Sequence, residues 1–108
     1  MKLLLDESVP ATLRRYMPGH DVSTVVGMGW SGVKNGKLLA LAAASFDALI
    51  TIDKNMPFQQ NLSALPLPVF VLDAVSNEVA FLLALLPQLE AALLAPKARR
   101  FVVIRRTA

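Results

Sequence analysis

Short apolar runs alternate along this chain with segments of helical pattern. The runs combine apolar and β-branched residues over five or six positions, which is typical of buried strands. They predict five strands, at residues 1–5, 21–26, 47–52, 67–72 and 101–105. Apart from Lys2, Asp47 and Thr51, the runs at 1–5, 47–52 and 67–72 are apolar, so we expect both faces of the sheet to be covered.

Three segments between the strands predict helices. The first covers residues 10–16, with Pro10 in its first turn and Ser8 as its cap, and the second covers residues 36–45, capped by Asn35. The third covers residues 77–94, where Pro87 must kink the helix or start a new one. Alternating strands and helices predict an α/β fold, a three-layer sandwich with a central, mainly parallel sheet of roughly five strands.

Composition narrows the classes of protein. The 108 residues fit one domain, and a hydrophobic content of 55% excludes intrinsic disorder. The chain has no cysteine, which excludes disulfides, a cysteine nucleophile and thiolate zinc, and its only histidine is His20. We interpret His20 as a turn residue. Asp6 and Glu7 interrupt the apolar start, and no apolar run is long enough to span a bilayer, so we expect a cytoplasmic protein.

Three of the eight acids follow apolar strands directly: Asp6, Asp53 and Asp73, with Glu7 beside the first. In an open parallel sheet, ligands bind beyond the carboxyl ends of the strands. Clustered carboxylates repel one another, and a hard divalent cation removes that conflict, so this edge predicts a Mg²⁺ or Mn²⁺ site. Such a site suits phosphodiester hydrolysis, which needs no protein nucleophile. Alternatively, these acids cap helices or make local turns.

The segments LLLDESVP, GHDVSTV, NGKLLALAA and LITIDKNM stand in this order between residues 1 and 73. In this order they resemble the small PIN-like proteins, which are related to metal-dependent ribonucleases and are often found beside antitoxin-like genes. The resemblance implies a PIN-like fold and catalytic roles for Asp6, Glu7 and Asp53. It implies that Asp6 and Asp53 bind the metal, and we add Asp73 as a third ligand. It also implies that Thr51 orients a carboxylate or a metal-bound water. It further implies endoribonuclease activity, an RNA substrate and a toxin–antitoxin context.

One position departs from this family pattern. The family usually has an acid where the second helix opens, and this chain has Lys37 there. A lysine would weaken metal binding, contact phosphate or mark a lost activity, which leaves a binding or regulatory module as an alternative. The family also often has an aromatic residue after the aspartate of the third strand, and here the nearest is Phe58.

Basic and apolar residues suggest partners. The candidate nucleic-acid contacts are Arg14, Arg15, Lys37 and Lys54. After Glu90 the chain has five basic residues and no acid, which predicts an RNA-binding edge or a charged edge strand that deters aggregation. The helices at 36–45 and 77–94 offer more apolar surface than a small sheet needs, so we expect a homodimer or an antitoxin-like partner. Trp30 is expected to pack its glycine-rich loop onto the core.

A second resemblance competes with the first. Response-regulator receiver domains also carry acids after the first strand and an aspartate after the third, followed by a Met-Pro pair, as Asp6, Glu7 and Asp53 with Met56-Pro57 do here. Asp53 would then be a phosphoacceptor. A receiver has Ser or Thr after the fourth strand and lysine after the fifth, where this chain has Asp73 and Arg105-Arg106.

Overall fold

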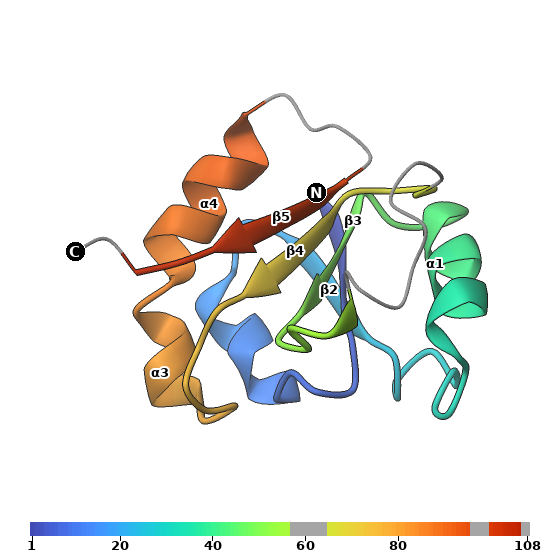
Figure 1. Cartoon of the computed structure of the whole chain (residues 1–108), viewed down its shortest axis with the longest axis horizontal. Helices are drawn as coiled ribbons and strands as arrows, with labels where there is room; N and C mark the ends of the chain where they lie inside the picture. Colours follow the sequence, from blue (N-terminus) through green and yellow to red (C-terminus); the bar gives the residue numbers. More distant parts are fainter. Residues whose placement is uncertain (57–64, 96–99, 107–108) are drawn as a thin grey trace.

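A five-stranded, all-parallel sheet runs through the computed structural model, which describes residues 1–56, 65–95 and 100–106 (Figure 1). The strands are β1 (Lys2–Leu5), β2 (Asp21–Thr24), β3 (Ala48–Thr51), β4 (Val69–Leu72) and β5 (Phe101–Ile104). Their order across the sheet is β2-β1-β3-β4-β5, so β3 is central and β2 and β5 form the two edges. The predicted α/β class is therefore confirmed.

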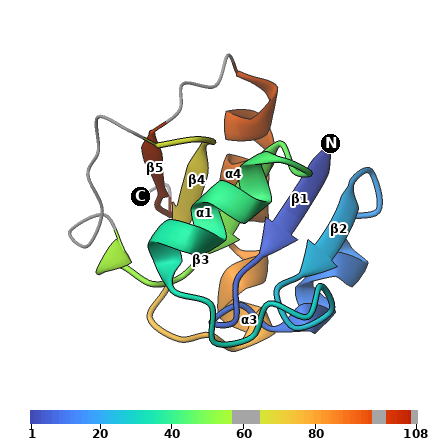
Figure 2. The ribbon, with the colours of Figure 1, turned by 90° about the vertical axis from the view of Figure 1, so that its right-hand side faces the viewer.

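Helical segments cover both faces of the sheet (Figures 1 and 2). The 3₁₀ helix η1 (Ala11–Tyr16) and the helices α3 (Val79–Leu83) and α4 (Leu86–Leu94) lie on one face, and α1 (Asn35–Ala43) lies on the other. Successive side chains of a strand point to opposite faces. Accordingly Leu3 and Leu5 join the core under η1, α3 and α4, and Leu4 joins the core under α1.

The connections create a change of direction beside the first strand. From β1 the chain moves outward to β2, and α1 then carries it back across to β3 on the other side of β1. Ligands of open α/β sheets bind at such a switch point, outside the carboxyl ends of the two strands. Asp6 directly follows β1, and Asp53 lies two residues beyond the end of β3, so both acids lie at this point.

Some predicted boundaries were wrong. Ser8 does not cap the first helix, which is a 3₁₀ helix with Pro10 at its N-cap, because the Ser8 hydroxyl bonds the Asp6 carboxylate instead. Lys34, rather than Asn35, is the N-cap of α1. The second strand ends at Thr24 rather than residue 26, because the Thr24 hydroxyl accepts the Gly27 N–H and turns the chain. Pro87 begins a new helix, as one alternative predicted.

Other boundaries shift by one or two residues, as helix and strand ends commonly do. Within the described residues, no helix is long and apolar enough to cross a membrane. Four residues of the patterns considered above lie outside the described residues: Pro57, Phe58, Lys97 and Arg99.

Gly32 gives a test of the loop that leads from β2 to α1. Its φ of +79° is unfavourable for a residue with a Cβ, so Gly32→Ala should cost about 1–2 kcal/mol and lower Tm by several degrees. Gly19→Ala is the matched control, because Gly19 has no positive φ and a Cβ added there would meet nothing within 4 Å. Thermal melting of both variants should separate them, and equal melting temperatures would contradict this account of the loop.

Candidate active site at the carboxyl edge of the sheet

The Asp6 carboxylate is held by hydrogen bonds from two segments. The Ser8 backbone N–H (3.0 Å) and the Ser8 hydroxyl (2.5 Å) donate to Oδ1, and the Thr51 hydroxyl donates to Oδ2 (2.5 Å). Asp6 is only 8% exposed and Thr51 is fully buried. Together these bonds tie the end of β1 to the end of β3. The Thr51 hydroxyl thus contacts a carboxylate, one of the two partners that the resemblance implied for it.

Backbone groups just after β3 complete this network. The Asp53 N–H donates to the Thr51 hydroxyl oxygen (3.0 Å), and the Ile52 N–H donates to the Ser8 hydroxyl oxygen (3.3 Å). Each hydroxyl therefore both donates to Asp6 and accepts from the backbone. This arrangement fixes the path of the chain that leads to the second acid.

Burial raises the pKa of Asp6 above its usual value, and the hydrogen bonds from Ser8 and Thr51 offset part of that rise. The negative charge of Asp53 adds to the rise, so the two carboxylates are close enough to repel each other. Because the pKa is higher in the folded than in the unfolded chain, folding becomes less favourable as pH rises through that pKa. A cation bound nearby would offset both the cost of burying the Asp6 charge and its repulsion by Asp53.

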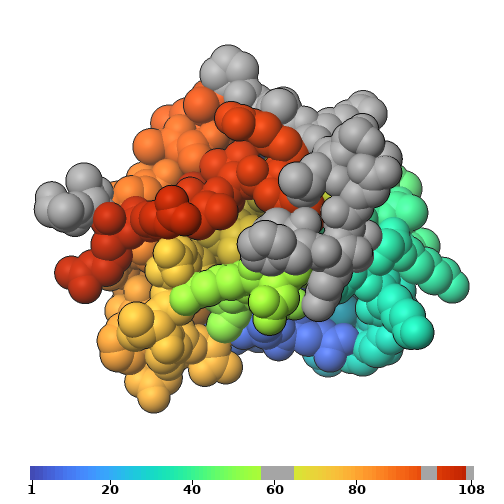
Figure 3. Space-filling view, in the orientation of Figure 1, coloured from blue at the N-terminus to red at the C-terminus, as the bar shows by residue number. Residues whose placement is uncertain are grey.

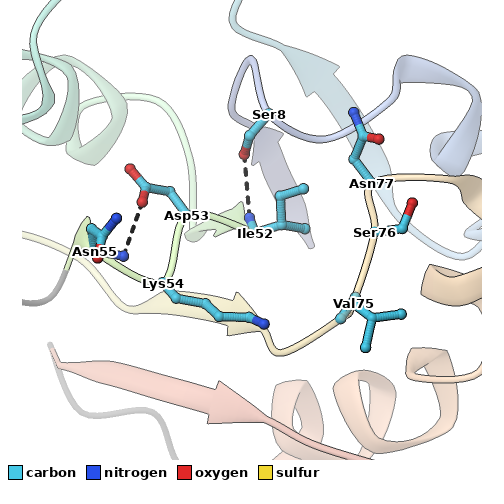
Figure 4. Close-up of a pocket in the computed structure, with 9 residues that line it drawn as sticks. Ser8, Ile52, Asp53, Lys54, Asn55, Val75, Ser76 and Asn77 are labelled. Carbon is cyan, nitrogen blue, oxygen red and sulfur yellow. Dashed lines mark hydrogen bonds between the residues drawn. The ribbon is translucent and has the colours of Figure 1, made fainter.

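Asp53 borders an open cleft of about 490 Å³ (Figure 4). Its Oδ1 accepts the Asn55 N–H (2.9 Å), which is a local turn of the kind that the alternative interpretation expected. Figure 4 shows Lys54 and Asn55 on one side of the cleft and Val75, Ser76 and Asn77, from the segment between β4 and α3, on the other. The volume is in the range of small-ligand sites.

Asp73 makes ion pairs rather than joining the other acids. Its Oδ1 lies 2.9 Å from the Lys54 ammonium, and its Oδ2 accepts a hydrogen bond from Nε of Arg105 (3.3 Å). The hydrogen bond from Lys54 is the main cause that lowers the pKa of Asp73, and the Arg105 guanidinium lowers it further. The part of the chain that the structure describes contains no group of three or more His, Asp or Glu side chains placed to hold a metal ion.

The remaining candidates occupy separate places. Glu7 accepts the Gly32 N–H (2.7 Å) and so holds the loop before α1. Lys37 is exposed in the first turn of α1, which begins near this carboxyl edge. Arg14 and Arg15 are exposed in the last turn of η1, where the chain returns toward the amino end of β2.

His20 lies at the amino ends of the strands, directly before β2, and so at the opposite end of the sheet from the acids. Its Nε2 contacts the Glu90 carboxylate of α4 (3.0 Å), and its Nδ1 lies 3.4 Å from the amino group of Met1. The prediction of a turn residue was correct about its position but missed these side-chain and terminal contacts. Trp30 packs against the core beside Phe46, as predicted.

Sequence reasoning missed two residues that organise this edge. Ser8 was assigned to a helix cap, and Arg105 was noted only as part of a basic tail. The Asp-x-Ser spacing of residues 6 and 8 could have suggested a local side-chain bond to the carboxylate. No local signal links Arg105 to Asp73, because the two residues are 32 positions apart.

Comparison of the chain with family models, with curated proteins and with solved structures found no match.

Thr51 provides a test of the buried network. Thr51→Val keeps the shape but removes a hydrogen bond to a buried charge and an acceptor for the Asp53 N–H, so we expect a loss of about 2 kcal/mol. Thr51→Ser keeps the hydroxyl and loses one buried methyl group, worth about 0.8 kcal/mol. Urea denaturation should rank Thr51→Val as the less stable variant, and the reverse order would show that the hydroxyl is unimportant.

Proposed function

We propose that this chain is a metal-dependent ribonuclease of PIN-like type that uses Mg²⁺ or Mn²⁺. The observation that carries the proposal is the pair of acids, Asp6 and Asp53, at the switch point of a parallel sheet, where the charge of one raises the pKa of the other. Repelling carboxylates at a ligand-binding edge favour a divalent cation.

The available oxygens fit such a cation. Oδ2 of Asp6 accepts one hydrogen bond from the described residues, and Oδ1 of Asp53 accepts one, so each carboxylate keeps lone pairs for a metal. Mg²⁺ typically keeps several waters and is bound by one or two carboxylates together with substrate phosphates. The metal would supply charge neutralisation at phosphate and an activated water. Ser8 and Thr51 would hold Asp6 in position, and Asp53 would border the cleft that receives RNA.

The proposal includes a protein partner, either a second copy or an antitoxin-like protein. Large apolar side chains are exposed on α3, α4 and β5: Phe81 is 45% exposed, Leu94 is 88% exposed and Val103 is 42% exposed. A partner would remove these side chains from water.

A receiver domain is the second candidate. The strand order β2-β1-β3-β4-β5 is also that of flavodoxin-like receivers, which favours this candidate at the level of the fold. Its phosphoacceptor would be Asp53. Incubation with acetyl phosphate in Mg²⁺, followed by intact-protein mass measurement, distinguishes the two candidates: a phosphate adduct lost in Asp53→Asn supports the receiver, and its absence supports the nuclease.

Asp6→Asn and Asp53→Asn test the proposed function. Each removes a carboxylate that would hold the metal, so RNA cleavage in Mn²⁺ should fall at least about a hundredfold, because the metal supplies several kcal/mol in the transition state. The assay is cleavage of a mixed-sequence RNA by purified protein. Unchanged cleavage in both variants would disprove the proposal.

Asp6→Asn also tests the alternative capping role, by its effect on Tm in metal-free buffer. An amide at position 6 carries no charge, so Asp6→Asn should match or exceed the wild-type Tm at pH 7. A fall of more than about 4 °C, which corresponds to ~1 kcal/mol in a domain of this size, would favour a purely structural role for Asp6.

Lys37→Glu tests the departure from the family pattern. A carboxylate in the first turn of α1 would add negative charge near the acids, so Mn²⁺ should bind more tightly and RNA cleavage should rise. Lys37→Gln is the control, because it removes the positive charge without adding a ligand. Isothermal titration measures the Mn²⁺ affinity of wild type and of both variants. Equal affinities of wild type and Lys37→Glu would show that residue 37 lies outside the metal site.

A further inference from the structure

Three neighbouring strand ends place charged side chains beside the cleft. Lys54 follows β3, Asp73 follows β4 and Arg105 follows β5, so their side chains line up along the same carboxyl edge as Asp6 and Asp53. Figure 3 shows the segments that carry them side by side on one face, in green, yellow and red. Arg106 lies next to them, where it lines a small cavity of about 90 Å³ together with Asp73 and Phe81.

Positive charge exceeds negative charge in this row. Within the described residues, Asp73 is the only acid that forms ion pairs with these cations, and it contacts both Lys54 and Arg105. The cations stay accessible, since Lys54 is 52% exposed and Arg105 is 73% exposed. Exposed ion pairs are weak, so an incoming anion can displace Asp73 at small cost.

We infer that Lys54 and Arg105, with Arg106 beside them, form a phosphate-binding wall that holds a single-stranded nucleic-acid backbone along the cleft. Asp73 is the counter-ion that orients these cations until the phosphates replace it. This inference rests on the proposed function, because it concerns how the same edge holds its RNA substrate. It replaces the metal-ligand role that the sequence suggested for Asp73 with a role in substrate binding.

Nucleic acid fits this wall better than an acidic protein segment does. Lys54 also lines the cleft, and the cleft adds Asn55, Ser76 and Asn77, whose amides and hydroxyl suit phosphate and ribose oxygens. The wall begins at Lys54, the residue that follows Asp53, so a bound backbone would pass the acid pair. Lysine and arginine at phosphate positions give affinity without sequence preference.

Fluorescence anisotropy with a 2′-O-methyl oligonucleotide in EDTA tests the wall without metal or cleavage. The double variant Lys54→Glu/Arg105→Glu should bind on the order of tenfold more weakly and lower the salt slope by about 0.7 for each lost contact. Asp73→Asn should bind more tightly than wild type. The matched control is Lys2→Glu, compared with Lys54→Glu alone: it makes the same change of charge at the amino end of β1 and should bind within about twofold of wild type.

Each result decides the inference. If the control variant loses as much affinity as the wall variant, general positive charge is responsible for binding. If polyglutamate competes as well as the oligonucleotide does, the site binds acidic protein. Either result overturns the inference of a phosphate-binding wall. Lys54→Gln/Arg105→Gln repeats the measurement if the double glutamate variant does not fold. If the wall variants lose binding but wild type cleaves no RNA, the nuclease proposal fails and the wall stands. If wild type cleaves RNA and the wall variants bind normally, the wall fails and the nuclease proposal stands.

Discussion

The buried Asp6 carboxylate is the constraint on which the carboxyl edge of this molecule depends. Asp6 is the one ionisable side chain that the described residues bury, and burying a charge is costly unless hydrogen bonds satisfy it. Ser8 and Thr51 supply those bonds, and in doing so they join the loop after β1 to the end of β3. The same two hydroxyls accept backbone N–H groups of the chain that leads to Asp53. One desolvated charge therefore sets the positions of both acids.

Acids and cations occupy different parts of this edge, with one exception. The acids Asp6 and Asp53 follow β1 and β3, and the cations Lys54 and Arg105 lie toward β4 and β5, where the acid Asp73 pairs with both. An RNA chain requires both kinds of group, because its phosphates need cations for binding and a metal for hydrolysis. Asp53 and Lys54 both line the cleft, together with neutral polar side chains such as Asn55, Ser76 and Asn77, so an acid and a cation face the same space.

Local patterns predicted the sheet well because the apolar runs of β1, β3 and β4 are buried on both faces, as Leu3, Leu4 and Leu5 illustrate. The order of strands placed Asp6 and Asp53 at one edge, as expected from their positions after strands. The partners of polar side chains were not predictable. His20 contacts Glu90 across 70 positions and Glu7 contacts Gly32 across 25, and such pairs depend on how distant elements pack. Ser8 shows the same limit at short range, since a buried carboxylate outcompeted the helix end for its hydroxyl.

The parallel arrangement of β1 has a consequence for how the chain folds. Its two neighbours begin at residues 21 and 48, so β1 lacks a full set of backbone partners until the segment that forms β3 is available. Contacts between residues far apart in sequence form slowly, because a long loop must close first. The Asp6–Thr51 bond spans 45 positions and belongs to the later of these two pairings. A chain in which β1 and β3 have not yet paired thus has no assembled acid pair, and any activity of this edge arises only after that pairing.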